Sequence, residues 1–176
     1  KTLKQFEAEA LKIIGEFGEN LKDSIFAYSV PHYHSYGFVF DFLVPYILEL
    51  KFLDNRINYL ETLNNFEEYK EITFITNPAF LKRIDKSSLK IKSKWYVFSS
   101  TGALDKETSD LCIETFNTDA IEIYGSTEGG GMAYGKKSEK DLWTRLKIVK
   151  LKVNENGSLF CSSGYTGEGL WVHVGD

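Results

Sequence analysis

The sequence has few cysteines and a small net charge, and each shortage argues against a class of protein. Its two cysteines, Cys112 and Cys161, lie far apart and form no C-x-x-C pair, which argues against a zinc site. Reduced, buried thiols in a cytoplasmic protein are the expected state. The net charge is −4 and lysines alternate with acidic residues, so no basic surface for nucleic acid is expected.

Long apolar runs and dinucleotide fingerprints are missing as well. The longest apolar run, residues 38–50, is interrupted by Asp41, Pro45 and Glu49 and is too short to span a membrane. The first residues read as turns of a helix and not as a signal peptide. No G-x-G-x-x-G follows an early strand, which argues against a dinucleotide-binding dehydrogenase.

The remaining sequence alternates between strand and helix patterns. Hydrophobic residues make up 43% of the chain, enough for a sizeable core. Strands are predicted at residues 24–30, 72–76, 95–99 and 121–124, and helices at residues 3–17, 38–50, 55–63, 79–84 and 106–116. Residues 31–37 are a predicted loop, and Pro45 a possible kink. This alternation predicts an α/β fold with a parallel sheet flanked by helices.

The pattern changes after Gly135. Residues 146–153 alternate between apolar and basic types, residues 154–157 are a hairpin turn signal, and further strands are predicted at residues 158–162 and 170–174. We therefore expect a small antiparallel β lobe. The predicted division is an α/β subdomain at 1–137 and the lobe at 138–176.

The stretch from residue 121 to residue 132 carries most of the functional information. A buried strand ends in Tyr124, and Gly125, Ser126, Thr127 and Glu128 follow, before three more glycines. Glycine has no Cβ, so a loop of this composition lets a ligand approach the backbone. Ligands bind at the carboxyl ends of strands in open α/β sheets. An aromatic face, hydroxyls and one acid at that place suit a nucleotide and its metal ion.

Tyr-Gly-Ser-Thr-Glu at residues 124–128 resembles the adenine- and magnesium-binding signature of the adenylate-forming enzymes, which include acyl-CoA synthetases and peptide-synthetase adenylation domains. Three more motifs follow the family order. Residues 31–37 resemble P-x-x-H-x-x-G beside the acyl pocket, and residues 99–104 resemble the S-G-G-A-P/L turn along the adenine. Gly175 and Asp176 resemble the end of T-G-D. The resemblance covers nearly the whole chain, with Val174 and Thr101 as departures from the family's threonine and glycine.

The resemblance assigns a role to each matching residue. Tyr124 would stack on adenine, Thr127 would reach the α-phosphate, and Glu128 would hold Mg²⁺. His34 would lie near the carboxylate that is activated, and Asp176 would bind the ribose hydroxyls. The other nucleotide-binding residues it implies are Gly102, Ala103, Gly125 and Ser126. From the residues alone, His32, His34 and nearby tyrosines could instead form a local polar cluster.

The implied reaction joins a small carboxylic acid to AMP from ATP and then to a thiol. The thiol would belong to coenzyme A or to the pantetheine of an acyl carrier protein. The family's phosphate loop, with its lysine, and its small C-terminal domain have no counterpart here. We therefore expect a central segment of the large N-terminal domain that is inactive alone. A non-catalytic nucleotide-binding or interaction module with the same fold is the alternative. A serine-, threonine- and glycine-rich stretch upstream of Lys1 would favour the enzyme.

Overall fold

The computed structural model describes residues 1–85, 89, 91–139, 142–167 and 169–174. Helix α1 (Leu3–Leu21) opens the chain, and Thr2 caps its N-terminus in a capping box with Gln5. Its apolar face packs on the sheet, where the ring of Phe17 meets that of Phe98 edge to face at 5.2 Å. The predicted helix is therefore present, and it runs three residues past Gly18.

The large sheet has six strands in the order β1-β2-β3-β4-β5-β6. Strands β1 (Ile25–Tyr28), β2 (Glu71–Thr76), β3 (Lys94–Ser99) and β4 (Ile121–Ser126) pair in parallel. Strand β5 (Gly130–Lys136) pairs antiparallel to β4, and β6 (Trp143–Arg145) pairs antiparallel to β5 at the edge of the sheet. The predicted α/β class is confirmed, and the sheet is mixed because the chain turns back on itself after β4.

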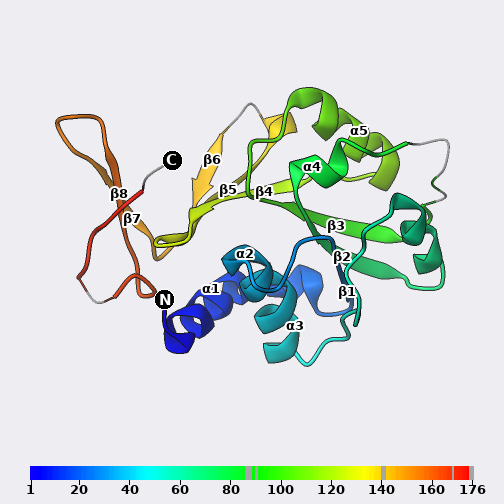
Figure 1. The fold of residues 1–176 in the computed structure, drawn as a ribbon, viewed down its shortest axis with the longest axis horizontal. Helices are drawn as coiled ribbons and strands as arrows, with labels where there is room; N and C mark the ends of the chain where they lie inside the picture. Colours follow the sequence, from blue (N-terminus) through cyan, green and yellow to red (C-terminus); the bar gives the residue numbers. More distant parts are fainter. Residues whose placement is uncertain (86–88, 90, 140–141, 168, 175–176) are drawn as a thin grey trace.

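Helices cover both faces of this sheet (Figure 1). One face carries α1, α2 (Ser35–Gly37), the π-helical segment η1 (Phe38–Leu43) and α3 (Val44–Ile47). The other carries α4 (Pro78–Leu81) and α5 (Lys106–Phe116), and the 3₁₀ helix η2 (Leu60–Phe66) packs into the hydrophobic core on that face. Side chains alternate along a strand, so Phe98 lies in the core beneath α1 and its neighbour Val97 lies in the core beneath α5.

Two predicted helices differ from the structure. Residues 55–59 are not helical, because the N–H of Ile57 donates to the carbonyl of Tyr28 (2.7 Å) and holds this segment beside β1. The helical stretch predicted at 38–50 begins earlier, at Ser35, and includes the wide turn η1 just before Pro45. Proline donates no hydrogen bond and crowds the preceding turn, and a widened turn relieves both problems.

The second sheet is a three-stranded antiparallel one, of β7 (Lys150–Val153), β8 (Leu159–Ser162) and β9 (Val172–His173). The predicted hairpin turn joins β7 to β8, where Gly157 has φ +81°. The predicted division at residue 137 falls before β6, which still pairs with β5 in the large sheet. A short 3₁₀ turn η4 (Lys137–Glu139) lies between those two strands.

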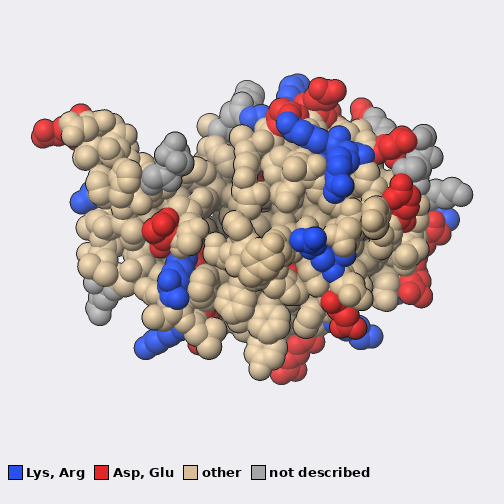
Figure 2. All heavy atoms as spheres, viewed as in Figure 1, with Lys and Arg blue, Asp and Glu red and all other residues tan. Residues whose placement is uncertain are grey.

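Charged side chains of both signs lie among one another on the face shown in Figure 2. Within the described ranges, every helix is too short or too polar to cross a bilayer.

Candidate nucleotide and acid site

The glycine-rich stretch forms a tight β-hairpin. Strand β4 continues through Ser126, and β5 begins at Gly130, antiparallel to it. The hydroxyl oxygen of Ser126 accepts a hydrogen bond from the N–H of Gly129 (2.9 Å), which closes the turn. A Cβ on Gly125 would lie 2.4 Å from the carbonyl oxygen of Gly130, so a side chain there would prevent this pairing. The predicted loop is thus the tip of a hairpin, and it exposes Thr127 and Glu128.

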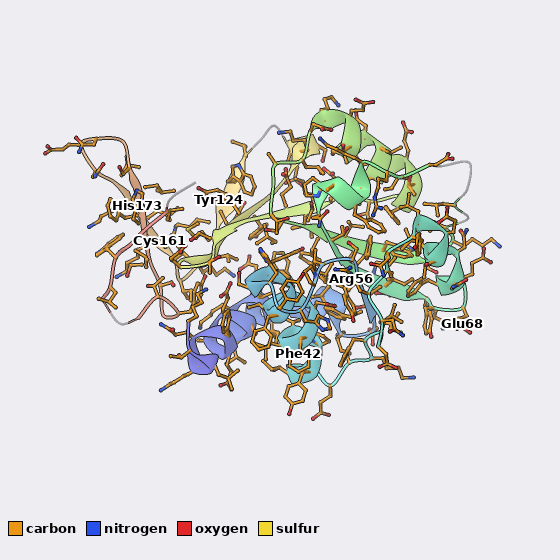
Figure 3. All side chains as sticks on the ribbon, in the orientation of Figure 1. Phe42, Arg56, Glu68, Tyr124, Cys161 and His173 are labelled. Atoms are coloured by element: carbon orange, nitrogen blue, oxygen red, sulfur yellow. The ribbon has the colours of Figure 1, made fainter. Side chains whose placement is uncertain are left out.

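A cavity of about 800 Å³ lies along this hairpin at the carboxyl end of β4. The residues that line it include Gly102, Ala103, Tyr124, Gly125, Ser126 and Thr127, the predicted nucleotide-binding residues of the described chain, and Glu128, the predicted magnesium ligand. Tyr124 is 41% exposed, and its ring lies 5.6 Å from that of Trp143 on β6. Figure 3 shows Tyr124 at the end of the large sheet nearest the antiparallel sheet that carries Cys161 and His173.

A second cavity, of about 260 Å³, opens on the other side of the same backbone. It contains His34, Ser35, Tyr36 and Phe40 from the helical side of the sheet, and Glu9 from α1. The two cavities share Ser100, Thr101, Ile123, Gly125, Ser126 and Thr127. The structure therefore places His34 in the smaller space and the other described site residues around the larger one, with Thr127 at the junction.

The loop after β3 lies against β4 through two side-chain hydrogen bonds. The hydroxyl of Ser100 donates to the carbonyl of Ile123 (2.8 Å), and the N–H of Leu104 donates to the buried carboxylate of Glu122 (2.8 Å). These contacts fix the backbone of Gly102 and Ala103 at the wall of the large cavity. Sequence reasoning missed Glu122, which reads as one acid inside an apolar strand, and Trp143, which lies in a strand that was not predicted.

Thr101 has φ +72°, a left-handed conformation that β-branched residues rarely adopt. Such strain destabilises the folded state by about 1–3 kcal/mol. A glycine at the same position loses more conformational entropy on folding, which destabilises the folded state by about 0.5–1 kcal/mol. We expect Thr101→Gly to raise the free energy of unfolding by about 1 kcal/mol, measured by urea denaturation. Thr62→Gly, in η2 at negative φ, is the control and should lower it. A loss of stability in Thr101→Gly would contradict the strain.

The loop that carries His34 is held by a buried contact. The Nδ1 atom of His34 accepts a hydrogen bond from the N–H of Tyr36 and caps α2. Next to it, Nε2 of His32 lies 2.5 Å from Oδ2 of Asp41, and the His32 ring stacks on Tyr28 at 4.3 Å. The two histidines therefore have different partners: His32 contacts Asp41 and Tyr28, which lie outside the loop, while His34 lines the small cavity.

Burial raises the pKa of Asp41 to about 9 and lowers the pKa of His32, so near neutral pH the contact joins two uncharged groups. The unfolded state has already lost the Asp41 proton at pH 7, whereas the folded state keeps it up to about pH 9. Folding stability should therefore fall between pH 7 and 9, by at most about 1.4 kcal/mol per pH unit.

Asp41→Asn should remove this part of the pH dependence, as measured by urea denaturation at pH 7, 8 and 9. Asp110→Asn, an exposed acid on α5, should keep it. Parallel stability curves for Asp41→Asn and the wild type would show that the Asp41 carboxyl is already ionised at pH 7.

Glu128 suits a magnesium ion that is shared with phosphate oxygens. Its carboxylate is exposed at the hairpin tip, and no side chain in the described ranges pairs with it. Those ranges hold no cluster of three acidic, histidine or cysteine side chains that could bind a metal by themselves. Mg²⁺ often takes only one or two carboxylates and completes its shell with phosphate and water, so a single free acid is a fitting donor. Gly175 and Asp176 lie outside the described residues, so the ribose-binding prediction has no structural placement.

No protein-family model and no curated protein matches the sequence. Several solved structures are similar to the structure of this chain. The o-succinylbenzoate CoA synthetase MenE from Bacillus subtilis is 14% identical, with a TM-score of 0.75 over 100% of this chain and 42% of its own. VinN, in complex with L-aspartate, is 14% identical, with a TM-score of 0.76 over 98% and 50%. The anthranilate CoA ligase AuaEII, in complex with anthranoyl-AMP, is 16% identical, with a TM-score of 0.70 over 98% and 40%.

These likenesses establish the fold, and each covers nearly the whole of this chain. The chain spans half or less of the length of these three proteins. The chain therefore has the fold that part of these CoA ligases adopts.

Proposed function

We propose that the chain is the central part of an ATP-dependent ligase that adenylates a carboxylic acid and passes the acyl group to a thiol. The observation that carries this proposal is the pair of cavities that meet at Thr127. The reaction needs a nucleotide and an acid on either side of one phosphorus atom. The larger cavity suits the nucleotide, and the smaller one suits the acid.

Each site residue within the described ranges then helps to position the nucleotide or the acid. Tyr124 presents a half-exposed ring for adenine, and Gly102 and Ala103 line the same cavity. The hydroxyl of Thr127 donates to the α-phosphate at the junction. His34, in the smaller cavity, orients the carboxylate. Catalysis in such a site comes mainly from holding two reactants in line and from hydrogen bonds to developing charge.

In the first step a carboxylate oxygen of the acid attacks the α-phosphorus of ATP, and the bond to pyrophosphate breaks. In the second step a thiolate attacks the acyl carbon and AMP leaves. Glu128 would hold Mg²⁺, which when bound neutralises charge on the phosphate oxygens. Coenzyme A and the pantetheine of a carrier protein both supply a suitable thiol. The CoA ligases among the similar structures favour coenzyme A.

Two assays test the proposal. Isothermal titration of the 176-residue chain with AMP tests the nucleotide site, and binding in the micromolar to millimolar range is expected. Pyrophosphate release from ATP, with a panel of carboxylic acids and Mg²⁺, tests the reaction in the polypeptide that carries these residues. We expect the 176 residues alone to bind AMP without turnover. If the full-length polypeptide that contains these residues binds AMP but activates none of the acids, the chain belongs to a nucleotide-binding module and not to a ligase.

A further inference from the structure

The smaller cavity has an exposed end and a buried end, and the buried end holds a carboxylate. His34, Thr101 and Thr127 are exposed, and Thr101 and Thr127 also line the larger cavity. Glu9 and Phe40 are buried, and Glu9 is only 5% exposed. An acid bound with its own carboxylate at Thr127 therefore points its far end toward Glu9.

The charge of Glu9 is balanced inside the protein. Its Oε2 lies 2.6 Å from the ammonium of Lys1, whose side chain is 4% exposed, and its Oε1 accepts a hydrogen bond from the N–H of Gly131 at 2.7 Å. The ammonium also lies 5.5 Å from the ring of Phe6 and 5.3 Å from that of Tyr165. The ion pair is neutral overall, so it does not repel an anionic substrate.

This arrangement leaves Glu9 with unused hydrogen-bonding capacity at the cavity wall. An ionised carboxylate has about four acceptor positions, and Lys1 and Gly131 use two of them. The rest of the buried wall consists of glycine backbone and of the rings of Tyr36 and Phe40. The centroids of these two rings lie 5.0 Å apart. A compact substrate with an apolar body would fit these walls, but its far end would meet an acceptor.

We propose that Glu9 accepts a hydrogen bond from a hydroxyl or amino group at the far end of the substrate. The preferred substrates are then compact hydroxy- or amino-substituted carboxylic acids, with a ring that packs on Tyr36 and Phe40. A cavity of about 260 Å³ lies below the usual range of about 300–1,000 Å³ for small-molecule sites, which favours a single ring over a long chain. This inference rests on the proposed function and narrows its substrate class.

Titration of the 176-residue chain with substituted benzoic acids tests the inference, with AMP titrated in parallel. Hydroxy- and aminobenzoic acids donate a hydrogen bond, while methylbenzoic acids of the same substitution pattern match their size and do not donate. A hydrogen bond to a charged acceptor corresponds to about 10- to 100-fold in affinity. We expect the hydroxy and amino acids to bind more tightly than the methyl acids by that factor.

Glu9→Gln should bring the hydroxy, amino and methyl acids close to equal affinity, whereas Glu7→Gln, on the exposed side of α1, should keep the preference. Equal binding of all three acids by the wild type would overturn the inference, as would a preference that survives in Glu9→Gln or no acid binding in a chain that binds AMP. If Glu9→Gln does not fold, the wild-type series alone decides. Failure to bind AMP would count against the proposed function and not against the role of Glu9.

Discussion

Replacement of Tyr124 by alanine is expected to weaken AMP binding by about 5- to 150-fold. Stacking of a base on an aromatic ring contributes about 1–3 kcal/mol, and 1.4 kcal/mol corresponds to a factor of ten. Tyr124 is the aromatic residue of the hairpin that lines the large cavity, and it is open enough to receive a base. Isothermal titration of wild type and variant with AMP measures the effect.

Two variants control this measurement. Tyr124→Phe keeps the ring and should bind AMP nearly as the wild type does, because stacking does not need the hydroxyl. Tyr59→Ala removes a tyrosine that is 73% exposed before η2, outside both cavities, and should not change the affinity. Unchanged AMP affinity in Tyr124→Ala would show that the adenine lies elsewhere.

Glu9→Ala is expected to lower the free energy of unfolding by about 3–5 kcal/mol. Removal of one partner of a buried ion pair leaves the other charge unpaired, and here that charge is the ammonium of Lys1. The N–H of Gly131 loses its acceptor at the same time. Urea denaturation, followed by circular dichroism, measures the change.

Glu7→Ala is the matched control, because this acid lies two residues away on the exposed side of α1. Its effect should stay within about 0.5 kcal/mol, as is usual for surface positions. A loss below about 1 kcal/mol in Glu9→Ala would show that Lys1 reaches solvent when its partner is removed.

The parts of the fold that the sequence predicted are those with strong local signals. The bounds of α5, Lys106–Phe116, are those predicted, and in the structure Asp105 caps its start and Asn117, in a left-handed conformation, ends it. Strands β2 and β3 were predicted to within one residue, since both are runs of apolar and β-branched side chains. In these segments local propensity and tertiary packing agree.

The strands that escaped prediction depend on distant contacts. Strand β5 is rich in glycine, which weakens any strand signal, and it is held by pairing with β4 and by two side chains far away in sequence. Glu9 accepts from the N–H of Gly131, and the hydroxyl of Tyr165 donates to the carbonyl of the same residue. Strand β6 has three residues, all exposed, and shows no periodic pattern.

The candidate site likewise contains some residues that the sequence predicted and others that it did not. The hairpin residues adjacent in sequence, from Tyr124 to Glu128, were predicted together and line one cavity together. The role of each of these residues remains a prediction, because only a structure with a bound ligand would show what each side chain contacts. The acid at the end of the second cavity was not predicted, because Glu9 and Gly131 are 122 positions apart and only the fold brings them together.

A crystal structure of the chain with AMP tests the central claim most directly. The two cavities predict that the adenine packs on Tyr124 between β6 and the loop at residues 100–104, with the phosphate at Thr127 where the smaller cavity begins. Nucleotide bound away from the β4–β5 hairpin, or an empty large cavity in crystals grown at millimolar AMP, would contradict it.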